Sequence, residues 1–268
     1  MRAVHVSLRS VEKRFDAQGQ AKPVQALGPL DLDLKIGEFF AVVGPSGCGK
    51  STLLEVIAGL AQVSSGTVAF EGAPIGGDIP DGIGVVFQED ACFPWLSVRD
   101  NIEFGLRRKR MDKGERASRV ARAIDMMGLT AFADSYPAQL SGGMRQRVCI
   151  ARTLVMQPRL ILLDEPFGAL DQQTRLIMGE ELLKLWRDTG ATVFLITHAL
   201  DEAAMLADRI GVMSARPGRL LETIETGWPR DRDSRIVADA RFGEVTARLW
   251  GLLREESMKS IGARAQPE

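Results

Sequence analysis

The chain has 268 residues, 45% of them hydrophobic and 26% charged, which excludes a mainly disordered protein and predicts one large α/β domain with an inserted lobe, or about two domains. Its 34 basic and 35 acidic residues leave a formal net charge of −1, which excludes a strong positive field for holding nucleic acid. Three scattered cysteines, no apolar run of about 18 residues and no signal-peptide core predict a cytosolic protein that reaches a membrane only through a partner.

The first part of the chain has the character of strands. Residues 4–8 and 30–34 alternate between apolar and polar, and residues 39–43 form a continuous apolar run, which is typical of a strand buried on both faces. Helical spacing then runs from 50 to about 60. Two further strands are predicted at 68–70 and 83–87.

The middle of the chain is helical and the second half alternates strand with helix. Helical spacing covers 98–127, and another helix is predicted at about 142–156. Strand, helix, strand, helix and strand follow at 160–163, 172–188, 192–196, 200–207 and 210–213. Such alternation predicts a parallel sheet. We therefore expect an α/β domain over 1–232 with an antiparallel β portion near its N-terminus and a helical lobe at about 90–158.

The C-terminal part, 233–268, is predicted to be a docked helix with a frayed tail. Residues 234–254 carry apolar side chains on one helical face, and Asp233-Ser234 precedes them as a cap. We expect the last ten or so residues to be frayed.

A glycine-rich segment follows the buried run at 39–43. It fits the pattern G-x-x-x-x-G-K-[ST] with the residues Gly44, Pro45, Ser46, Gly47, Cys48, Gly49, Lys50 and Ser51. Its glycines let successive N–H groups point at phosphate oxygens, and the helix that follows adds its positive end. We expect Lys50 to span the β- and γ-phosphates, Ser51 to bind Mg²⁺ and Thr52 to reach the α-phosphate. A chance glycine-rich turn would not explain why a strand precedes this segment and a helix follows it.

Two carboxylates follow a second continuous apolar run, at residues 160–163. Asp164 and Glu165 follow four apolar residues, at the strand edge where α/β sheets bind ligands. We expect Asp164 to hold Mg²⁺ and Glu165 to orient and polarise an attacking water. Adjacent acids that merely cap a loop would leave the preceding strand unexplained. Both motifs together predict a P-loop NTPase, and ATP is favoured because the guanine-selecting motif Asn-Lys-x-Asp is absent.

Ser141, Gly142 and Gly143 begin the helix predicted at 142–156. Free N–H groups and a hydroxyl at a helix start form a second anion-binding terminus, although alone they could be a plain N-cap. Between a P-loop and the pair Asp164-Glu165, this triplet closely resembles the signature of ABC-type ATPases. The resemblance extends over nearly the whole chain. A small-molecule P-loop kinase would have no use for the triplet.

The resemblance implies roles for further residues. Gln88 matches the Q-loop glutamine, which senses Mg²⁺ and the permease, and Asp171 matches the D-loop. His198 matches the switch histidine that contacts the γ-phosphate, and Phe15 lies where the family places an aromatic ring on adenine. Ala199 stands where the family usually has Asp, which removes a hydrogen-bond acceptor near the histidine.

Four short segments resemble the nitrate/sulfonate/taurine importer group, namely 93–98, 165–171, 207–209 and 216–218. The resemblance implies an ATP-hydrolysing subunit, peripheral on the cytoplasmic face of a bacterial inner membrane, that serves a permease fed by a periplasmic binding protein. One P-loop and one signature per chain mean that two chains are needed for complete sites, and the resemblance implies that they form a head-to-tail dimer. The segment 88–101 is predicted to dock a permease helix, unless it is local core of the lobe. A soluble ABC-type ATPase without a permease is the alternative function, but it would need a coiled-coil insertion, zinc cysteines or tandem cassettes.

Overall fold

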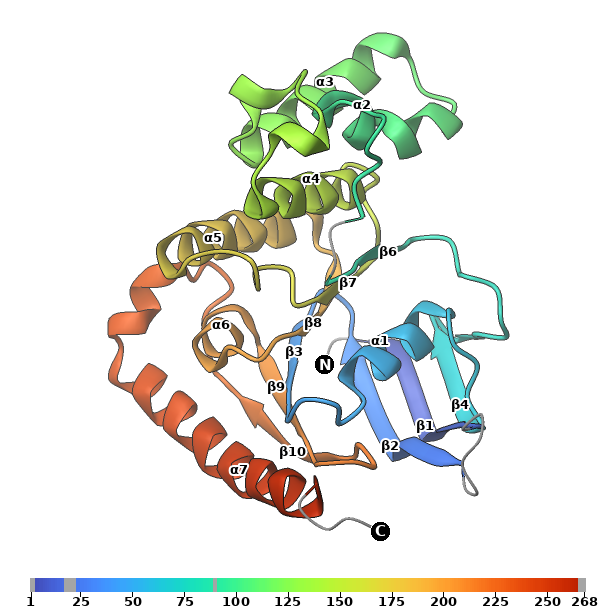
Figure 1. The fold of residues 1–268 in the computed structure, drawn as a ribbon, viewed down its shortest axis with the longest axis vertical. Helices are drawn as coiled ribbons and strands as arrows, with labels where there is room; N and C mark the ends of the chain where they lie inside the picture. The colour runs from blue at the N-terminus through green and yellow to red at the C-terminus, as the bar shows by residue number, and fades with distance from the viewer. Residues whose placement is uncertain (1–2, 17–22, 89–90, 265–268) are drawn as a thin grey trace.

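A six-stranded sheet in the order β10-β9-β3-β8-β7-β6 forms the centre of the computed structural model, which describes residues 3–16, 23–88 and 91–264 (Figure 1). Its strands are β3 (Phe39–Val43), β6 (Ile83–Val86), β7 (Leu160–Asp164), β8 (Thr192–Ile196), β9 (Arg209–Met213) and β10 (Leu220–Glu225). All neighbours pair in parallel except β10, which is antiparallel to β9. Every residue of β3, β7 and β8 is buried, as their apolar runs predicted.

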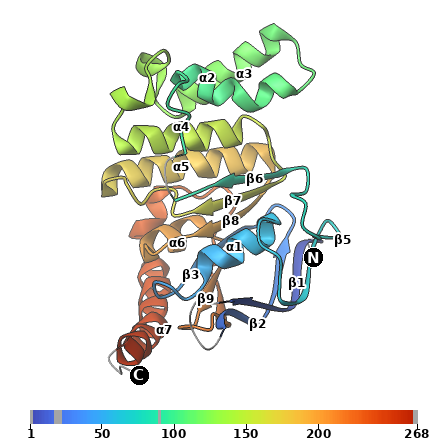
Figure 2. The same cartoon turned by 45° about the vertical axis from the view of Figure 1, so that its right-hand side comes forward.

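A second, antiparallel sheet lies beside the first and has the order β2-β1-β4-β5 (Figure 2). Its strands are β1 (Val4–Phe15), β2 (Val24–Lys35), β4 (Ser65–Phe70) and β5 (Ala73–Pro74). The first two strands are 12 residues long and extend beyond the alternating segments that predicted them. The predicted antiparallel portion near the N-terminus is confirmed.

The hydrophobic core has two parts, one on each face of the central sheet. Phe40, Val42 and Phe194 point to the side of the antiparallel sheet and α1 (Lys50–Ala58). Phe39 and Leu195 point to the other side, where α5 (Gln172–Thr189) and α6 (Leu200–Leu206) cover the sheet. Successive residues of a strand face opposite ways, so each buried strand serves both cores.

The helical lobe comprises α2 (Val98–Glu103), a 3-10 turn (Phe104–Arg108), α3 (Lys113–Met126), two 3-10 turns (Thr130–Phe132, Pro137–Gln139) and α4 (Gly142–Leu154). The sequence predicted continuous helical spacing over 98–127, but the structure divides it. The backbone is extended at Lys109, and the side chain of Asp112 accepts hydrogen bonds from the N–H groups of Gly114 and Glu115, so that a new helix begins. Figure 1 shows α4 as the part of the lobe nearest the sheet, with α5 between α4 and the sheet.

The C-terminal part differs from its prediction at both ends. Asp233 caps a 3-10 turn, Ser234–Ala238, and the helix α7 begins only at Ala240. It continues to Arg264, so residues 259–264, expected in the frayed tail, are helical, while 265–268 lie outside the described residues. The helix packs against α6 and β9, with Leu249 fully buried. Val237, expected on the buried face, is 43% exposed because the 3-10 turn changes the helical phase.

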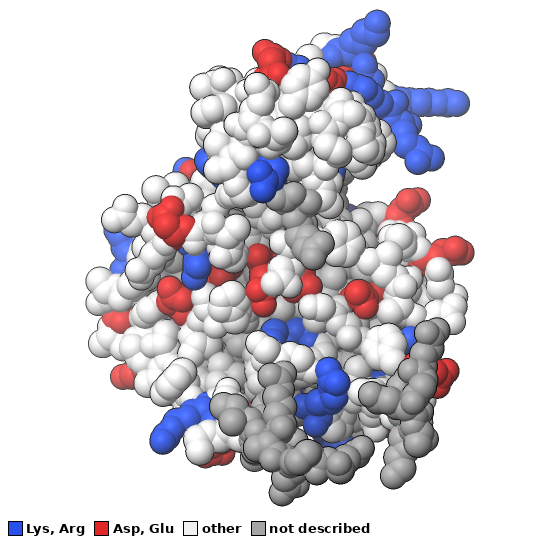
Figure 3. Space-filling model, in the orientation of Figure 1, with Lys and Arg blue, Asp and Glu red and all other residues white. Residues whose placement is uncertain are grey.

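Lysine and arginine side chains gather on the lobe, over the segment that joins α2 to α3, on the face drawn in Figure 3. Acidic and basic side chains are interspersed over the remainder of that face. Within the described part of the chain, no helix has the length and apolar character needed to cross a lipid bilayer.

Candidate active site

The glycine-rich segment 44–49 curls between the end of β3 and the start of α1. Gly49 has φ +109°, and a Cβ there would lie 2.7 Å from the carbonyl oxygen of Ala26. The loop can follow this path only with glycine at that position. Lys50 is buried, and its Nζ donates hydrogen bonds to the carbonyl oxygens of Gly44 and Pro45 at 2.8 and 3.0 Å. Its ammonium group therefore lies folded over the loop.

A pocket of about 400 Å³ opens beside this loop. Residues predicted for the site line most of it, namely Phe15, Ser46, Gly47, Gly49, Lys50, Ser51, Thr52, Gln88 and Glu165. Val24, Ala26 and Arg216 line it as well and were not predicted.

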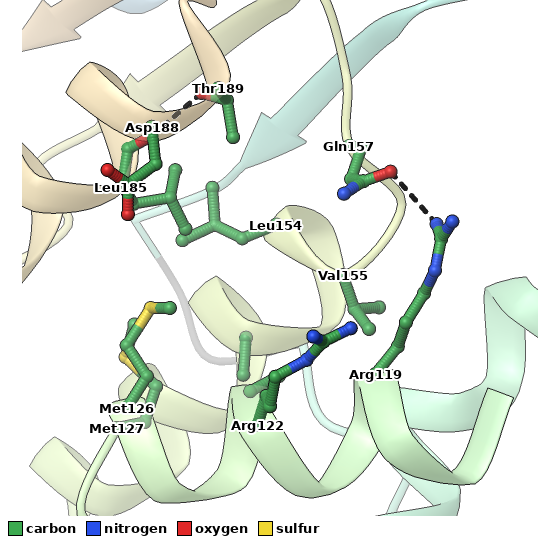
Figure 4. A pocket seen from close by; sticks show the side chains of 12 residues that line it. Arg119, Arg122, Met126, Met127, Leu154, Val155, Gln157, Leu185, Asp188 and Thr189 are labelled. Atoms are coloured by element: carbon green, nitrogen blue, oxygen red, sulfur yellow. Dashed lines mark hydrogen bonds between the residues drawn. The ribbon is translucent and has the colours of Figure 1, made fainter. Parts of the chain in front are cut away.

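A separate cavity of about 310 Å³ lies between α3, α4 and α5 (Figure 4). Apolar side chains form much of its lining, and Arg119 donates a hydrogen bond to Gln157 at its edge. None of the residues that line it belongs to the predicted site.

Asp164 ends β7 beside Ser51 of α1. Asp164 is 7% exposed, and this burial raises the pKa of its carboxyl group. A hydrogen bond from Ser51 opposes the shift, and the charge of Glu165 adds to it. The buried Oδ1 has no hydrogen-bond partner among the described residues. A buried carboxylate oxygen without a donor, next to a hydroxyl, fits the hard oxygen ligands that Mg²⁺ prefers.

Glu165 lies at the centre of a three-residue cluster. Its Oε2 accepts a hydrogen bond from Gln88 Nε2 at 3.0 Å and lies 3.1 Å from Nδ1 of His198. These residues follow β6, β7 and β8, whose carboxyl ends share one edge because the strands are parallel. Glu165 has φ +48°, in the left-handed region that residues other than glycine seldom adopt. The structure thus brings together three of the predicted residues beside the pocket.

The signature triplet lies at the start of α4, where the serine is the N-cap and the two glycines are the first helical residues. The Ser141 hydroxyl accepts a backbone N–H of the first turn at 3.3 Å, as an N-cap. A Cβ on Gly143 would lie 2.5 Å from the side chain of Leu170, so α4 packs closely on the segment before Asp171. Asp171 in turn caps α5 by accepting hydrogen bonds from the N–H and the hydroxyl of Thr174.

Neither the signature triplet 141–143 nor Asp171 lines the pocket of its own chain. Figures 1 and 2 show α4 on the far side of α5 from the helix α1 that begins at the glycine-rich segment. The four residues predicted to contact nucleotide from this side are therefore not brought to the P-loop that precedes them in the sequence.

Phe15 and Cys48 are two further residues of the predicted site. Phe15, at the end of β1, is 43% exposed, lines the pocket and has Lys13 Nζ 4.9 Å from its ring centroid. Cys48 is buried, and burial raises the pKa of its thiol.

Glu202 is a buried carboxyl group near the site, and no sequence motif predicted it. The Thr197 hydroxyl donates to its Oε2 at 2.6 Å and accepts from the N–H of Ala199, so Glu202 supports the turn that carries His198. Burial raises the pKa of Glu202 to about 7, opposed by the bond from Thr197 and the charge of Arg175. No local pattern marks it, because an acid in the first turn of α6 is also an ordinary helix-start residue.

We expect Glu202→Gln to change how stability depends on pH. The charges of Asp201 and Glu165 also raise the pKa of Glu202, so its folded-state value exceeds the usual 4.5. The stabilisation by the protonated carboxyl is complete below about pH 4.5 and is lost as the pH rises through 7. The free energy of unfolding is measured with urea for both proteins at pH 5 and pH 8. Relative to the wild type, the variant should be more stable at pH 8 than at pH 5. An equal difference at both values would contradict the assignment.

Comparison with known proteins agrees with this geometry. The family model for ABC transporters matches residues 27–168, which include the glycine-rich segment, the signature triplet and the pair Asp164-Glu165. The taurine import ATP-binding protein TauB of Jannaschia sp. is 41% identical over 265 residues, covering 96% of this chain and 97% of the relative. The nitrate import ATP-binding protein NrtD of Synechocystis sp. is 38% identical over 268 residues, covering 98% and 100%.

The fold is also that of a solved relative. The ATP-binding cassette MJ0796, in a dimeric post-hydrolysis structure bound to ADP and Pi, superposes with a TM-score of 0.75 at 33% identity, covering 84% of this chain and 100% of the other. The matches to TauB and NrtD extend over nearly the full length of those two relatives. The chain therefore belongs to the ABC transporter family, as an ABC-type ATPase that binds ATP.

Proposed function

We propose that this chain is the ATP-hydrolysing subunit of a bacterial importer for a small anion of the sulfonate or nitrate type. The convergence of Gln88, Glu165 and His198 beside the P-loop pocket is the observation that supports hydrolysis. The names of the relatives, which import taurine and nitrate, support the solute class. In this proposal the subunit is peripheral and meets the cytoplasmic face of the inner membrane through a permease.

The roles in hydrolysis follow from the positions of the side chains. The P-loop N–H groups and the Lys50 ammonium bind the phosphates, and Phe15 stacks on the adenine. Glu165 polarises the attacking water as a general base, while His198 contacts the γ-phosphate. Ser51, Asp164 and Gln88 would hold Mg²⁺, which neutralises phosphate charge when bound. The buried Oδ1 of Asp164 without a donor is the observation that fits this cation.

Two chains complete each site in this proposal. Because Ser141, Gly142, Gly143 and Asp171 lie outside the pocket of their own chain, we assign them to the nucleotide held by a second copy, in a head-to-tail dimer. The free N–H groups at the start of α4 would then face the phosphates from the opposite side. The dimeric arrangement of MJ0796 supports this assignment.

The segment 88–101 carries an exposed aromatic cluster, which supports docking of the permease there. Trp95 is 70% exposed, and its ring centroid lies 5.7 Å from that of Phe93, which in turn lies 4.5 Å from that of Phe104. A groove of about 750 Å³ runs beside Phe93 and Phe104 to Met156 of the α4–β7 connection. Residues 89 and 90 lie outside the described residues. A local core would bury these rings, but none of them is fully buried.

One side chain holds this segment in shape. Asn101 is fully buried, and its Nδ2 donates to the carbonyl oxygens of Phe93, Leu96 and Ser97, while its Oδ1 accepts the N–H of Phe93. A loop with its polar groups satisfied in this way keeps Trp95 outward without an ordering cost on binding. Exposed, preordered tryptophan is typical of the anchors at protein interfaces.

Capture by a permease tests the function. We expect Trp95→Ala to weaken binding to a detergent-solubilised permease of the taurine or nitrate importer type by about tenfold or more, because an anchoring tryptophan commonly contributes that much. Trp250→Ala, which removes a tryptophan 62% exposed on α7, is the matched control and should bind as the wild type does. If the wild-type chain binds neither permease, the alternative of an ABC-type ATPase without a permease is favoured. Uptake of labelled taurine and nitrate by the reconstituted complex then identifies the solute.

A further inference from the structure

The loop 214–219, which joins β9 to β10, touches the P-loop. Arg216 donates two hydrogen bonds to the carbonyl oxygen of Gly47, from Nε at 3.1 Å and from Nη2 at 2.9 Å. A Cβ on Gly218 would lie 2.2 Å from the carbonyl oxygen of Cys48, so the two loops pack with backbone in contact. The cationic Arg216 thus binds one carbonyl of the phosphate-binding turn, and its side chain lines the pocket.

The loop that carries Arg216 is held in a single shape. The N–H of Ser214 donates to the carbonyl oxygen of Arg219 at 2.9 Å, and the N–H of Arg219 donates to Ser214 Oγ at 3.0 Å. The N–H of Gly218 donates to the carbonyl oxygen of Ala26, which belongs to the pocket wall. A guanidinium on so constrained a loop has little freedom to move without moving the P-loop.

The C-terminal helix reaches the same loop from the other side. Glu256 of α7 is 4% exposed, and its Oε2 accepts the N–H of Ala215 at 2.8 Å. A buried carboxylate is costly unless donors satisfy it, and the N–H of Ala215 is one such donor. A chain of contacts therefore leads from Glu256 through Ala215 and Arg216 to Gly47.

We propose that α7 positions the phosphate-binding loop, with Glu256 and Arg216 as positioning residues for ATP. Glu256 fixes Ala215, the adjacent Arg216 fixes the carbonyl of Gly47, and the following N–H groups of the P-loop are thereby preordered toward the phosphates. The proposal rests on ATP binding at the P-loop. It gives the C-terminal helix a role in nucleotide affinity that packing against α6 and β9 does not require.

The test is ATP affinity of the full chain, measured by calorimetric titration. Because hydrogen bonds to charged groups contribute the most, Glu256→Ala should raise the Kd for ATP by about tenfold. Glu256→Gln retains an acceptor oxygen and should restore most of the affinity. Arg248→Ala is the matched control, since Arg248 joins α7 to Glu222 of β10 without touching the loop. A merely structural role for Glu256 would lower the melting temperature of Glu256→Ala and leave the Kd for ATP of the folded variant at the wild-type value.

A double-mutant cycle shows whether Glu256 acts through Arg216. Arg216→Ala should weaken ATP binding, and Glu256→Ala should add little in that background, since both break one chain of contacts. Arg219→Ala, on the same loop but bonded to Gly28, should leave affinity unchanged. Wild-type affinity in Glu256→Ala, or additive effects of the two substitutions, would overturn the inference. A wild-type chain that binds no ATP would instead reject the nucleotide site itself.

Discussion

Glu165→Gln is expected to keep ATP binding while turnover falls by about 10²–10⁴, the usual contribution of a positioned general base. Glutamine preserves the shape of the side chain and an oxygen that can accept from Gln88. It removes the carboxylate that polarises water, and the phosphate contacts of the P-loop are untouched. The measurements are release of phosphate at saturating ATP and the Kd for ATP. Near-normal turnover by the variant would exclude Glu165 as the base.

Lys50→Ala provides the contrasting variant. The Lys50 ammonium lies over the P-loop, where it bonds only the carbonyl oxygens of Gly44 and Pro45 among the described residues. Its removal deletes a charge held against the phosphates, so nucleotide binding itself should weaken. Lys50→Ala should raise the Kd for ATP, whereas Glu165→Gln should lower the rate of turnover. The two variants therefore separate nucleotide binding from hydrolysis.

Mixing two inactive chains is expected to recover hydrolysis if each nucleotide lies between two copies. Lys50→Ala removes a working P-loop, and Ser141→Arg blocks the signature because a large cation occupies the helix start. Each homodimer then has two defective sites. A mixed dimer has one site with both defects and one with neither, so activity should return to at most about half per mixed dimer, and to less if the sites are coupled. Phosphate release by the mixture measures this.

The geometry of a single chain motivates that experiment, because the triplet 141–143 lies outside the pocket that its own P-loop forms. If the signature served its own chain's nucleotide, both sites of the mixed dimer would remain defective. No recovery with mixed dimers shown to form would count against the head-to-tail arrangement, unless both sites must act together. A dimer of one wild-type chain with one doubly substituted chain resolves that exception, since it would then be inactive too.

Much of the fold follows from short-range pattern. The apolar runs of β3, β7 and β8 predicted buried strands, and parallel strands of this kind bring their carboxyl ends to one edge. Glu165 was predicted from the end of such a strand, whereas Gln88 and His198 were predicted from the family resemblance. The structure shows that the three residues follow the neighbouring parallel strands β7, β6 and β8. The glycine-rich turn was predicted from its local pattern alone, although the fold adds distant contacts to it, from Ala26 to Gly49 and from Arg216 to Gly47.

Helix boundaries were less predictable, because caps compete locally with periodicity. Asp112 begins a new helix within the apparently continuous spacing at 98–127, and Asp233 caps a 3-10 turn rather than α7. The strand β10 was also missed. It lies at the sheet edge and is partly exposed, so it lacks the apolar run that marked its neighbours.

The sequence by itself determined the glycine-rich segment, the pair Asp164-Glu165 and the layer of buried strands, since each rests on spacing within a short segment, while Gln88 and His198 followed from the family resemblance. Only the tertiary structure decided which distant groups support them. Arg216 and Gly47 are 169 positions apart, and Ala215 and Glu256 are 41 apart. A contact between such residues has no period and no fixed spacing, because it depends on how the intervening elements pack. It becomes visible only when the folded chain brings the two segments together.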